Sequence, residues 1–113
     1  MPDARHGRGE ILLAALTFSG LERVKKRPVV VLRDVGDDDL LVLPVTSHSP
    51  RSGHDMLVID WQGAGLKLPS VIRCEKIATI ARSTVVRRLG RLAEGDWQVV
   101  VTGVRAVLAE VLA

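Results

Sequence analysis

The sequence predicts a small, mostly antiparallel β-barrel with one C-terminal helix packed on it. Three observations lead to this fold class. Five to seven short apolar and β-branched runs recur along the chain, and turn-forming residues separate them every eight to twelve positions. The last twenty residues instead carry apolar side chains at helical spacing. The chain has 113 residues, which is the length of one domain that buries roughly two-thirds of its unfolded surface.

Three strands are predicted in the first half of the chain. Residues 9–16 favour a strand over a helix, because glycines precede a short apolar run. A loop at 17–25 leads to a strand at 27–33, where Pro28 suits the start because a strand's first residue needs no N–H. The apolar residues of this strand do not alternate with polar ones, which indicates that both faces are covered. After an aspartate-rich turn, a third strand covers 40–45 and has a proline near its end.

Shorter elements are predicted in the second half of the chain. The longest polar loop, at 46–55, separates them from the first three strands. They are, in order, a strand at 56–59, a turn at 60–65, a strand at 70–80 that breaks near Lys76, a helical turn or short strand at 82–89, and an interruption at Gly90. Together with the first three, they supply enough strands for a barrel.

A helix is predicted over residues 93–112. Glu94 and Asp96 lie in its first turn, where negative charge complements the helix dipole. Gly103 lies inside it at a cost of about 1 kcal/mol relative to alanine. One buried stripe is expected from the apolar residues at i, i+3 and i+4 spacing, which are Trp97, Val100, Val101, Val104, Leu108 and Val111.

Composition excludes several classes of protein. No apolar run reaches the roughly 18 residues of a membrane span, and the polar N-terminus lacks the apolar centre of a signal peptide. We expect a disordered tail at 1–8 and one domain at 9–113. The single cysteine, Cys74, excludes an intrachain disulfide and fits the reducing cytoplasm. No cofactor is expected, because the three histidines lack ligand spacing and no nucleotide-binding motif occurs.

The net charge of +3 is distributed unevenly along the chain. Residues 1–33 carry +4, residues 34–60 carry −5, and residues 61–113 carry +4. This alternation is compatible with a positive groove bordered by a negative rim, which suits a phosphate backbone. On charge alone, solvated faces on a mildly basic protein are the more common cause of such a distribution.

Polar residues at strand ends are the candidates for chemistry. Arg27 lies directly before the apolar strand, and Thr46 and Ser47 follow the next one. Arg73 and Glu75 share a strand face by period two. Each has a structural alternative. Arg27 could be a surface cation, the two hydroxyls could satisfy turn backbone, and the Arg73–Glu75 pair could be a surface ion pair worth less than ~1 kcal/mol.

These residues belong to motifs that occur in a fixed order. The motifs are Gly9-Glu10-Ile11, Glu22 followed by Lys26-Arg27-Pro28-Val29-Val30-Val31, Leu43-Pro44-Val45-Thr46-Ser47, Gly65-Leu66 leading to Pro69-Ser70-Val71-Ile72-Arg73-Cys74-Glu75-Lys76-Ile77, and Leu89-Gly90-Arg91-Leu92 before the helix. Each motif alone is weak, but their order and spacing cover the chain from about Gly9 to Leu112. In these features the chain resembles the MazF/PemK (Kid) toxins of type II toxin–antitoxin systems.

The resemblance implies an SH3-like antiparallel β-barrel with a C-terminal helix, a fold that these toxins share with CcdB toxins. It implies a cytoplasmic homodimer that cleaves single-stranded messenger RNA at short sequences without a metal ion. The products carry 2′,3′-cyclic phosphate and 5′-hydroxyl ends, and cleavage inhibits translation. A cognate antitoxin neutralises such a toxin by laying an acidic, disordered tail over the RNA groove.

The resemblance also assigns the site. It makes Arg27 and Thr46 central to cleavage, and Arg73 and Glu75 match the acid and base of the PemK branch, with glutamate in place of the more usual aspartate. Arg27 can offer a planar fork to phosphate, and Thr46 a hydrogen bond. Glu75 is the first candidate for the base. Further RNA contacts are expected from Glu22, which is also the second candidate base, and from Lys26, Ser47, His48 and Arg51.

One functional alternative remains open at this point. The same fold could serve as a non-catalytic binding module, such as a CcdB-like gyrase poison or an RNA binder. A gyrase poison acts by protein–protein contact and does not require the set formed by Glu22, Arg27 and Thr46. These residues therefore distinguish the two hypotheses.

Overall fold

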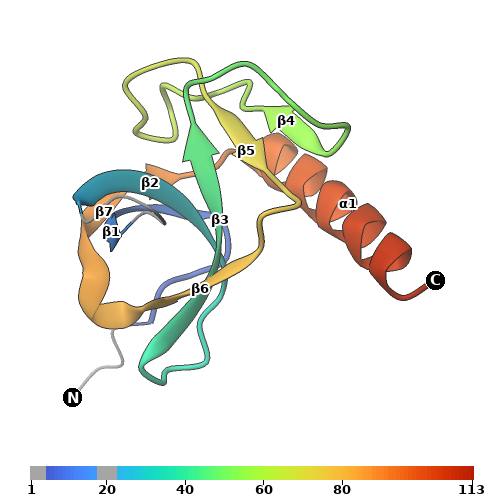
Figure 1. Cartoon of the computed structure of the whole chain (residues 1–113). Helices are drawn as coiled ribbons and strands as arrows, with labels where there is room; N and C mark the ends of the chain where they lie inside the picture. Colours follow the sequence, from blue (N-terminus) through green and yellow to red (C-terminus); the bar gives the residue numbers. More distant parts are fainter. Residues whose placement is uncertain (1–4, 18–22) are drawn as a thin grey trace.

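The computed structural model describes residues 5–17 and 23–113, and it confirms a mostly antiparallel β fold with a C-terminal helix (Figure 1). Within these residues the elements are β1 (Glu10–Thr17), β2 (Val24–Arg33), β3 (Asp39–Thr46), β4 (Asp55–Leu57), β5 (Val71–Arg73), β6 (Ala78–Ala81), the 3₁₀ helix η1 (Arg82–Thr84), β7 (Val85–Arg91) and α1 (Glu94–Val111). The predicted break near Lys76 separates β5 from β6. The loop expected at 17–25 is shorter, because β1 reaches Thr17 and β2 begins at Val24.

The strands form one strongly curved sheet. Its order is β4-β5-β3-β2-β1-β7, with β6 also paired to β3, and every pair is antiparallel. The chain turns from β6 through η1 into β7, which brings the curl back beside β1 (Figure 1). In the described part of the chain, β4 and β7 are the two ends of the pairing path, so hydrogen bonds curl the sheet without closing it.

Two apolar clusters cover the two faces of the central strands. Along β2, Val30 belongs to the cluster beneath α1, whereas Val29 and Val31 belong to the cluster inside the curl of the sheet. Successive strand residues point to opposite faces, so one run of valines supplies both cores. All three valines are at most 1% exposed. The prediction that this strand is covered on both faces is therefore confirmed.

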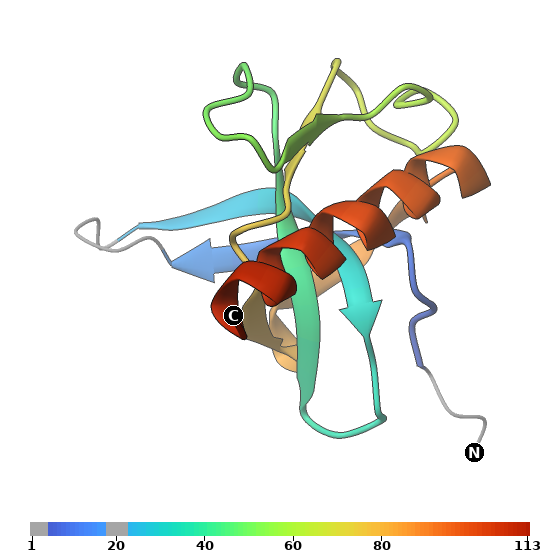
Figure 2. The same ribbon diagram turned by 90° about the vertical axis from the view of Figure 1, so that its right-hand side faces the viewer.

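The helix lies obliquely across the sheet, as Figure 2 shows, and its expected stripe is buried only in part. Val100 is fully buried, and Trp97 and Val104 pack against the same cluster. Leu108 and Val111 are 43% and 70% exposed, so the prediction that the stripe is buried to the last turn is wrong. The helix extends past the sheet that its first half covers, and the last turn therefore has no core beneath it.

Two residues of α1 have structural roles that the sequence pattern did not reveal. Asp96 is buried, and its carboxylate accepts the N–H groups of Ile59 at 3.0 Å and Asp60 at 2.9 Å, which ties the turn after β4 to the helix. Gly103 lies against Cys74, and a Cβ added at Gly103 would be 2.9 Å from the Cys74 sulfur. Glycine therefore allows the helix to approach the sheet closely at this point.

Gly90 does not interrupt the chain as expected but lies within β7. A Cβ on Gly90 would be 2.2 Å from the carbonyl oxygen of Ala64, and a Cβ on Gly65 would be 2.1 Å from that of Leu89. Gly65 also has a φ of +84°, which L side chains rarely adopt. The two glycines let the turn at 60–65 pack backbone against backbone on β7.

The segment before β1 is held in place by a hydrogen bond to Asp34, which forms an ion pair with Arg82. Asp34 receives the backbone N–H of His6 at 2.7 Å and two nitrogens of Arg82. The pKa of Asp34 lies well below its usual range. The Arg82 guanidinium donates hydrogen bonds to its carboxylate, as do the N–H groups of His6 and Gly36, and together they outweigh the effect of burial.

The domain boundary at residue 9 stays a prediction. Among residues 5–17 and 23–113, no helix combines the length and apolar character that crossing a bilayer demands.

Candidate active site

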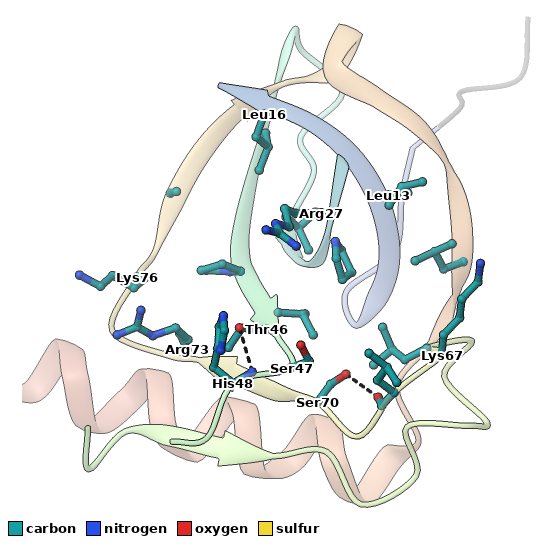
Figure 3. Close-up of a pocket in the computed structure, with 18 of the residues that line it drawn as sticks. Leu13, Leu16, Arg27, Thr46, Ser47, His48, Lys67, Ser70, Arg73 and Lys76 are labelled. Atoms are coloured by element: carbon teal, nitrogen blue, oxygen red, sulfur yellow. Dashed lines mark hydrogen bonds between the residues drawn. The ribbon is translucent and has the colours of Figure 1, made fainter. Parts of the chain in front are cut away.

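A cavity of about 950 Å³ opens on the sheet where β2 and β3 separate (Figure 3). The β2–β3 ladder runs from Arg33 paired with Leu41, across a register shift, to Val29 paired with Pro44. Beyond that rung, within the described residues, β2 pairs with β1 alone, and Val45 and Thr46 at the end of β3 pair with β5. Pro44 lies at this last rung, and Pro28 is the next residue of β2 and pairs with Leu13 on β1. Both prolines lack N–H donors, so neither can extend the β2–β3 ladder.

The separation of these strands places Arg27 and Thr46 on two sides of the same cavity. Val29 pairs with Pro44, so the same register continued would bring Arg27 opposite Thr46. Instead, Arg27 pairs with Ala14 on β1, and both Arg27 and Thr46 line the cavity. Pro28 is not the first residue of its strand, as the sequence had suggested, because β2 begins at Val24. Arg27 thus lies within a strand and not in front of it.

Thr46, Ser47 and His48 form the wall where β3 leaves the sheet. The hydroxyl oxygen of Thr46 accepts the backbone N–H of His48 at 3.2 Å. Thr46 thus does hydrogen-bond to turn backbone, as the structural alternative expected. An accepted hydrogen bond uses only a lone pair, so the hydroxyl proton can still be donated to a ligand. All three residues line the cavity.

Arg73 and Glu75 both line the cavity, but they do not share a strand face. β5 ends at Arg73, and Glu75 lies in the turn closed by the hydrogen bond from the Lys76 N–H to the Arg73 carbonyl. The acidic partner of Arg73 is Asp55, whose Oδ1 is 3.6 Å from the Arg73 Nε. The predicted Arg73–Glu75 pairing along one strand is therefore wrong, because the chain turns between the two residues.

Asp55 is a residue that sequence reasoning missed. It lies directly opposite Arg73 in the β4–β5 pair, and its side chain is only 2% exposed. Burial opposes ionisation, but the N–H groups of Arg51 and Ser52, the Ser52 hydroxyl and the charge of Arg73 lower the pKa of Asp55 below its usual value. The pairing joins strands separated by a long turn, so no local pattern in the sequence could have indicated it.

The cavity is strongly positive. Among residues 5–17 and 23–113, five cationic side chains line it, against one carboxylate, that of Glu75. The cations are Arg27, Lys67, Arg73, Lys76 and Arg87. Lys67, Lys76 and Arg87 were not predicted as site residues, and only the positive charge of residues 61–113 hinted at them. Such a surface attracts a polyanion.

The cavity gathers most of the predicted site and leaves part of it outside. Six predicted residues line it, namely Arg27, Thr46, Ser47, His48, Arg73 and Glu75. Lys26 and Arg51 are exposed and are not among the lining residues. Lys26 neighbours Arg27 on a strand and so points to the opposite face, while the backbone N–H of Arg51 binds Asp55 at 2.7 Å. Glu22 lies outside the described residues.

The described residues hold no group of three or more histidine, cysteine, aspartate or glutamate side chains that could bind a metal ion. Cys74 is buried in the cluster beneath α1. Burial, and secondarily the charge of Asp55, raises the pKa of its thiol to about 11. The thiol is thus protonated at neutral pH and behaves as a small apolar core residue.

Comparisons with known proteins place this geometry in context. The family model for PemK-like, MazF-like toxins of type II toxin–antitoxin systems matches residues 7–108. A curated relative from Mycolicibacterium smegmatis, named as a probable endoribonuclease MazF, is 33% identical over 93 residues. The match covers 79% of this chain and 84% of that relative.

Solved structures share the fold at low sequence identity. An endoribonuclease in complex with its cognate antitoxin from a mycobacterial species has a TM-score of 0.74 at 12% identity and covers 90% of this chain and 93% of that one. The Mycobacterium tuberculosis toxin MazF-mt6 has a TM-score of 0.71 at 21% identity, with coverages of 88% and 96%. A MazE–MazF structure from Deinococcus radiodurans has a TM-score of 0.73 at 19% identity and covers 96% of both chains.

Proposed function

The chain belongs to the family of PemK-like, MazF-like toxins of type II toxin–antitoxin systems, and we propose that it is an endoribonuclease that cleaves single-stranded RNA without a metal ion. One observation carries the proposal most directly. The separation of β2 and β3 creates a cation-rich cavity, and Arg27 and Thr46 lie on its two sides. A single strand can enter such a cavity because its backbone is flexible and its phosphates are not held in a duplex.

We propose a mechanism in which the 2′-hydroxyl of one nucleotide attacks the adjacent phosphorus. The P–O bond to the 5′-oxygen of the next nucleotide breaks, which leaves a 2′,3′-cyclic phosphate and a 5′-hydroxyl. Glu75 accepts the 2′ proton, because it is the one carboxylate that lines the cavity among the residues that the structure describes. Arg27 and Arg73 meet the negative charge that builds on the phosphate oxygens, and Thr46 donates a hydrogen bond to them.

The leaving 5′-oxygen must also gain a proton. The family resemblance gives this role to Arg73, but a guanidinium does not release its proton at any ordinary pH. His48 lines the cavity beside Thr46. Histidine is the side-chain type that most readily exchanges a proton near neutral pH. We therefore assign proton donation to His48 and electrostatic stabilisation to Arg73.

The proposed partners follow from the same chemistry. Structural neighbours of this chain are complexes with antitoxins. We propose that a cognate antitoxin covers the cavity with an acidic segment, since five cations line it. We also propose that the toxin is a homodimer that acts in the cytoplasm, where cleavage of messenger RNA inhibits translation.

Incubation of purified protein with defined single-stranded RNAs in excess EDTA tests the activity. We expect cleavage at a short preferred sequence, with product ends that carry a 2′,3′-cyclic phosphate and a free 5′-hydroxyl. Mass spectrometry of the fragments identifies both ends. If several RNAs of different sequence stay intact at micromolar protein, the protein is not a ribonuclease of this kind and a binding role on the same fold takes its place.

A further inference from the structure

The contact between Asp55 and Arg73 has an unusual geometry for an ion pair. The Nε atom of Arg73 is buried and, in the described part of the chain, has no hydrogen-bond partner. Asp55 Oδ1 lies 3.6 Å from this atom, which is longer than a hydrogen bond. A buried N–H of a charged group without an acceptor costs free energy. The guanidinium is therefore held by charge and packing close to, but not at, its best bonding geometry.

Asp55 itself cannot move to improve this contact. Its Oδ2 accepts the backbone N–H groups of Arg51 at 2.7 Å and Ser52 at 3.3 Å, and its Oδ1 accepts the Ser52 hydroxyl at 3.2 Å. The carboxylate is thus fixed by the turn in front of β4, and its side chain is almost fully buried. The fixed Asp55 carboxylate therefore sets the position of the Arg73 guanidinium, whose side chain is longer and partly exposed.

The same carboxylate acts on two walls of the cavity. Through the Arg51 and Ser52 N–H groups it fixes the end of the loop that begins with Ser47 and His48. Through its register position it faces Arg73, which lies on the wall that also carries Lys76 (Figure 3). A change at Asp55 therefore reaches both walls, although Asp55 is not among the residues that line the cavity.

We propose that Asp55 is a positioning residue for the cleavage reaction: it fixes the Arg73 guanidinium so that the guanidinium meets the reacting phosphate in one orientation. This inference rests on the proposed ribonuclease function. When a phosphate binds the terminal nitrogens of Arg73, a small shift of the guanidinium brings its Nε–H to Asp55 Oδ1 and completes the missing hydrogen bond. The orphaned Nε is thus satisfied in the complex with RNA.

Asp55→Asn is the informative variant, because asparagine keeps an oxygen for the turn and removes the charge that faces Arg73. We expect kcat to fall by about 10-fold to 100-fold with a much smaller change in KM, as for a misplaced group that acts in the transition state. In an Arg73→Ala background the same substitution should have no further effect on kcat. Asp34→Asn is the matched control: it alters a buried, arginine-paired carboxylate outside the cavity and should leave cleavage per folded molecule unchanged.

Two outcomes would overturn the proposal while the wild-type protein still cleaves RNA. One is an Asp55→Asn enzyme with wild-type kcat. The other is an Asp55→Asn effect that is equally large with and without Arg73. If the wild-type protein cleaves no RNA, the proposed function fails, and the positioning itself is decided by a separate measurement.

That measurement is the hydrogen exchange of arginine Nε–H groups in the wild-type protein, followed by NMR. It needs no variant, so it also holds if Asp55→Asn does not fold. The Arg73 Nε–H should exchange about 10-fold or more slowly than that of Arg105, which lies exposed on α1. Saturating inorganic phosphate should slow the exchange of the Arg73 Nε–H further, because the proposed shift completes its hydrogen bond to Asp55 Oδ1. Exchange at Arg73 that phosphate leaves unchanged would show that Asp55 does not fix the guanidinium against a bound phosphate.

Discussion

Arg27 is the residue on which the proposed chemistry depends most. It extends from the part of β2 that pairs only with β1 and lines the cavity. The sequence indicated it because a basic pair precedes a proline and a buried strand. What the sequence could not indicate was that Pro28 lies next to the last β2–β3 rung, which Val29 forms with Pro44, since a register across two strands is not a local property.

We expect Arg27→Ala to lower cleavage by about 100-fold or more, because a donor directed at the transition-state phosphate is lost. Stability should change little, since Arg27 is exposed. The measurement is single-turnover cleavage of a defined RNA, with thermal unfolding alongside. Arg105→Ala, which removes an exposed cation on α1 outside the cavity, is the control. Equal cleavage by the two variants would remove Arg27 from the mechanism.

Asp34 makes stability depend on pH. Its side chain is fully buried against Arg82, and its pKa is held well below the ordinary value of 3.8. A carboxylate with a depressed pKa in the folded state stabilises the protein above its unfolded pKa and loses that contribution as the pH falls below it. Breaking such a buried pair at neutral pH costs about 3–5 kcal/mol.

The prediction is that Asp34→Asn lowers the free energy of unfolding strongly at neutral pH, and that the gap to wild type narrows as the pH falls below about 4. Urea unfolding of both proteins at a series of pH values measures the gap. A gap that stays constant down to about pH 2 would mean that the Asp34 charge contributes nothing to stability.

At the scale of elements, the sequence predicted the strands, the break near Lys76 and the helix, because these follow from periodicity and turn residues. It failed at Gly90, which lies inside β7. The sequence pattern indicates an interruption there, whereas the strand needs a glycine because the turn at 60–65 approaches it closely. It also failed at Asp96, which binds the backbone after β4 and does more than complement the helix dipole. Both failures are tertiary contacts that no window of sequence contains.

The contact between α1 and Cys74 gives a prediction at this scale. Gly103→Ala should gain about 1 kcal/mol of helix propensity, but its Cβ would lie 2.9 Å from the Cys74 sulfur, and overpacking of this kind costs about 1–3 kcal/mol. We expect the single variant to be less stable than wild type. In a Cys74→Ala background the sulfur is gone, and the same change should stabilise the protein.

Denaturant unfolding of the two single variants and the double variant completes this cycle. Gly95→Ala, at a helical position where an added Cβ meets nothing within 4 Å, reports the propensity effect alone. Identical effects of Gly103→Ala with and without the Cys74 sulfur would show that the glycine is not needed for packing.

At the scale of the whole molecule, the end of α1 leaves apolar side chains without cover. Leu108, Val111 and Leu112 are 43%, 70% and 81% exposed. A cluster of exposed apolar residues on one element is typical of an association surface. It supports the proposed homodimer, in which a second copy of the chain would cover the helix end.

Val111→Asp should therefore shift the protein from dimer to monomer without unfolding it, because a charge is introduced into the proposed interface and the side chain contributes little to the core. Light scattering after size-exclusion chromatography, over a range of protein concentrations, measures the mass. Val35→Asp alters an exposed apolar residue in the turn between β2 and β3 and should leave the mass unchanged. A wild-type protein that is monomeric at about 100 μM would contradict the dimer.

The separation of β2 and β3 also bears on how the site meets its ligand. β3 pairs with β2 and β6 over its first part and with β5 over its last two residues, so one continuous strand joins the curled part of the sheet to the β4–β5 ribbon. A hinge motion between these two parts would have to break the backbone hydrogen bonds that pair β3 with its neighbouring strands. The width of the cavity is consequently set when the protein folds. In the proposed complex the RNA backbone must therefore adapt to this width, so the sequences cleaved best should be those whose backbone bends into this gap at the lowest free-energy cost.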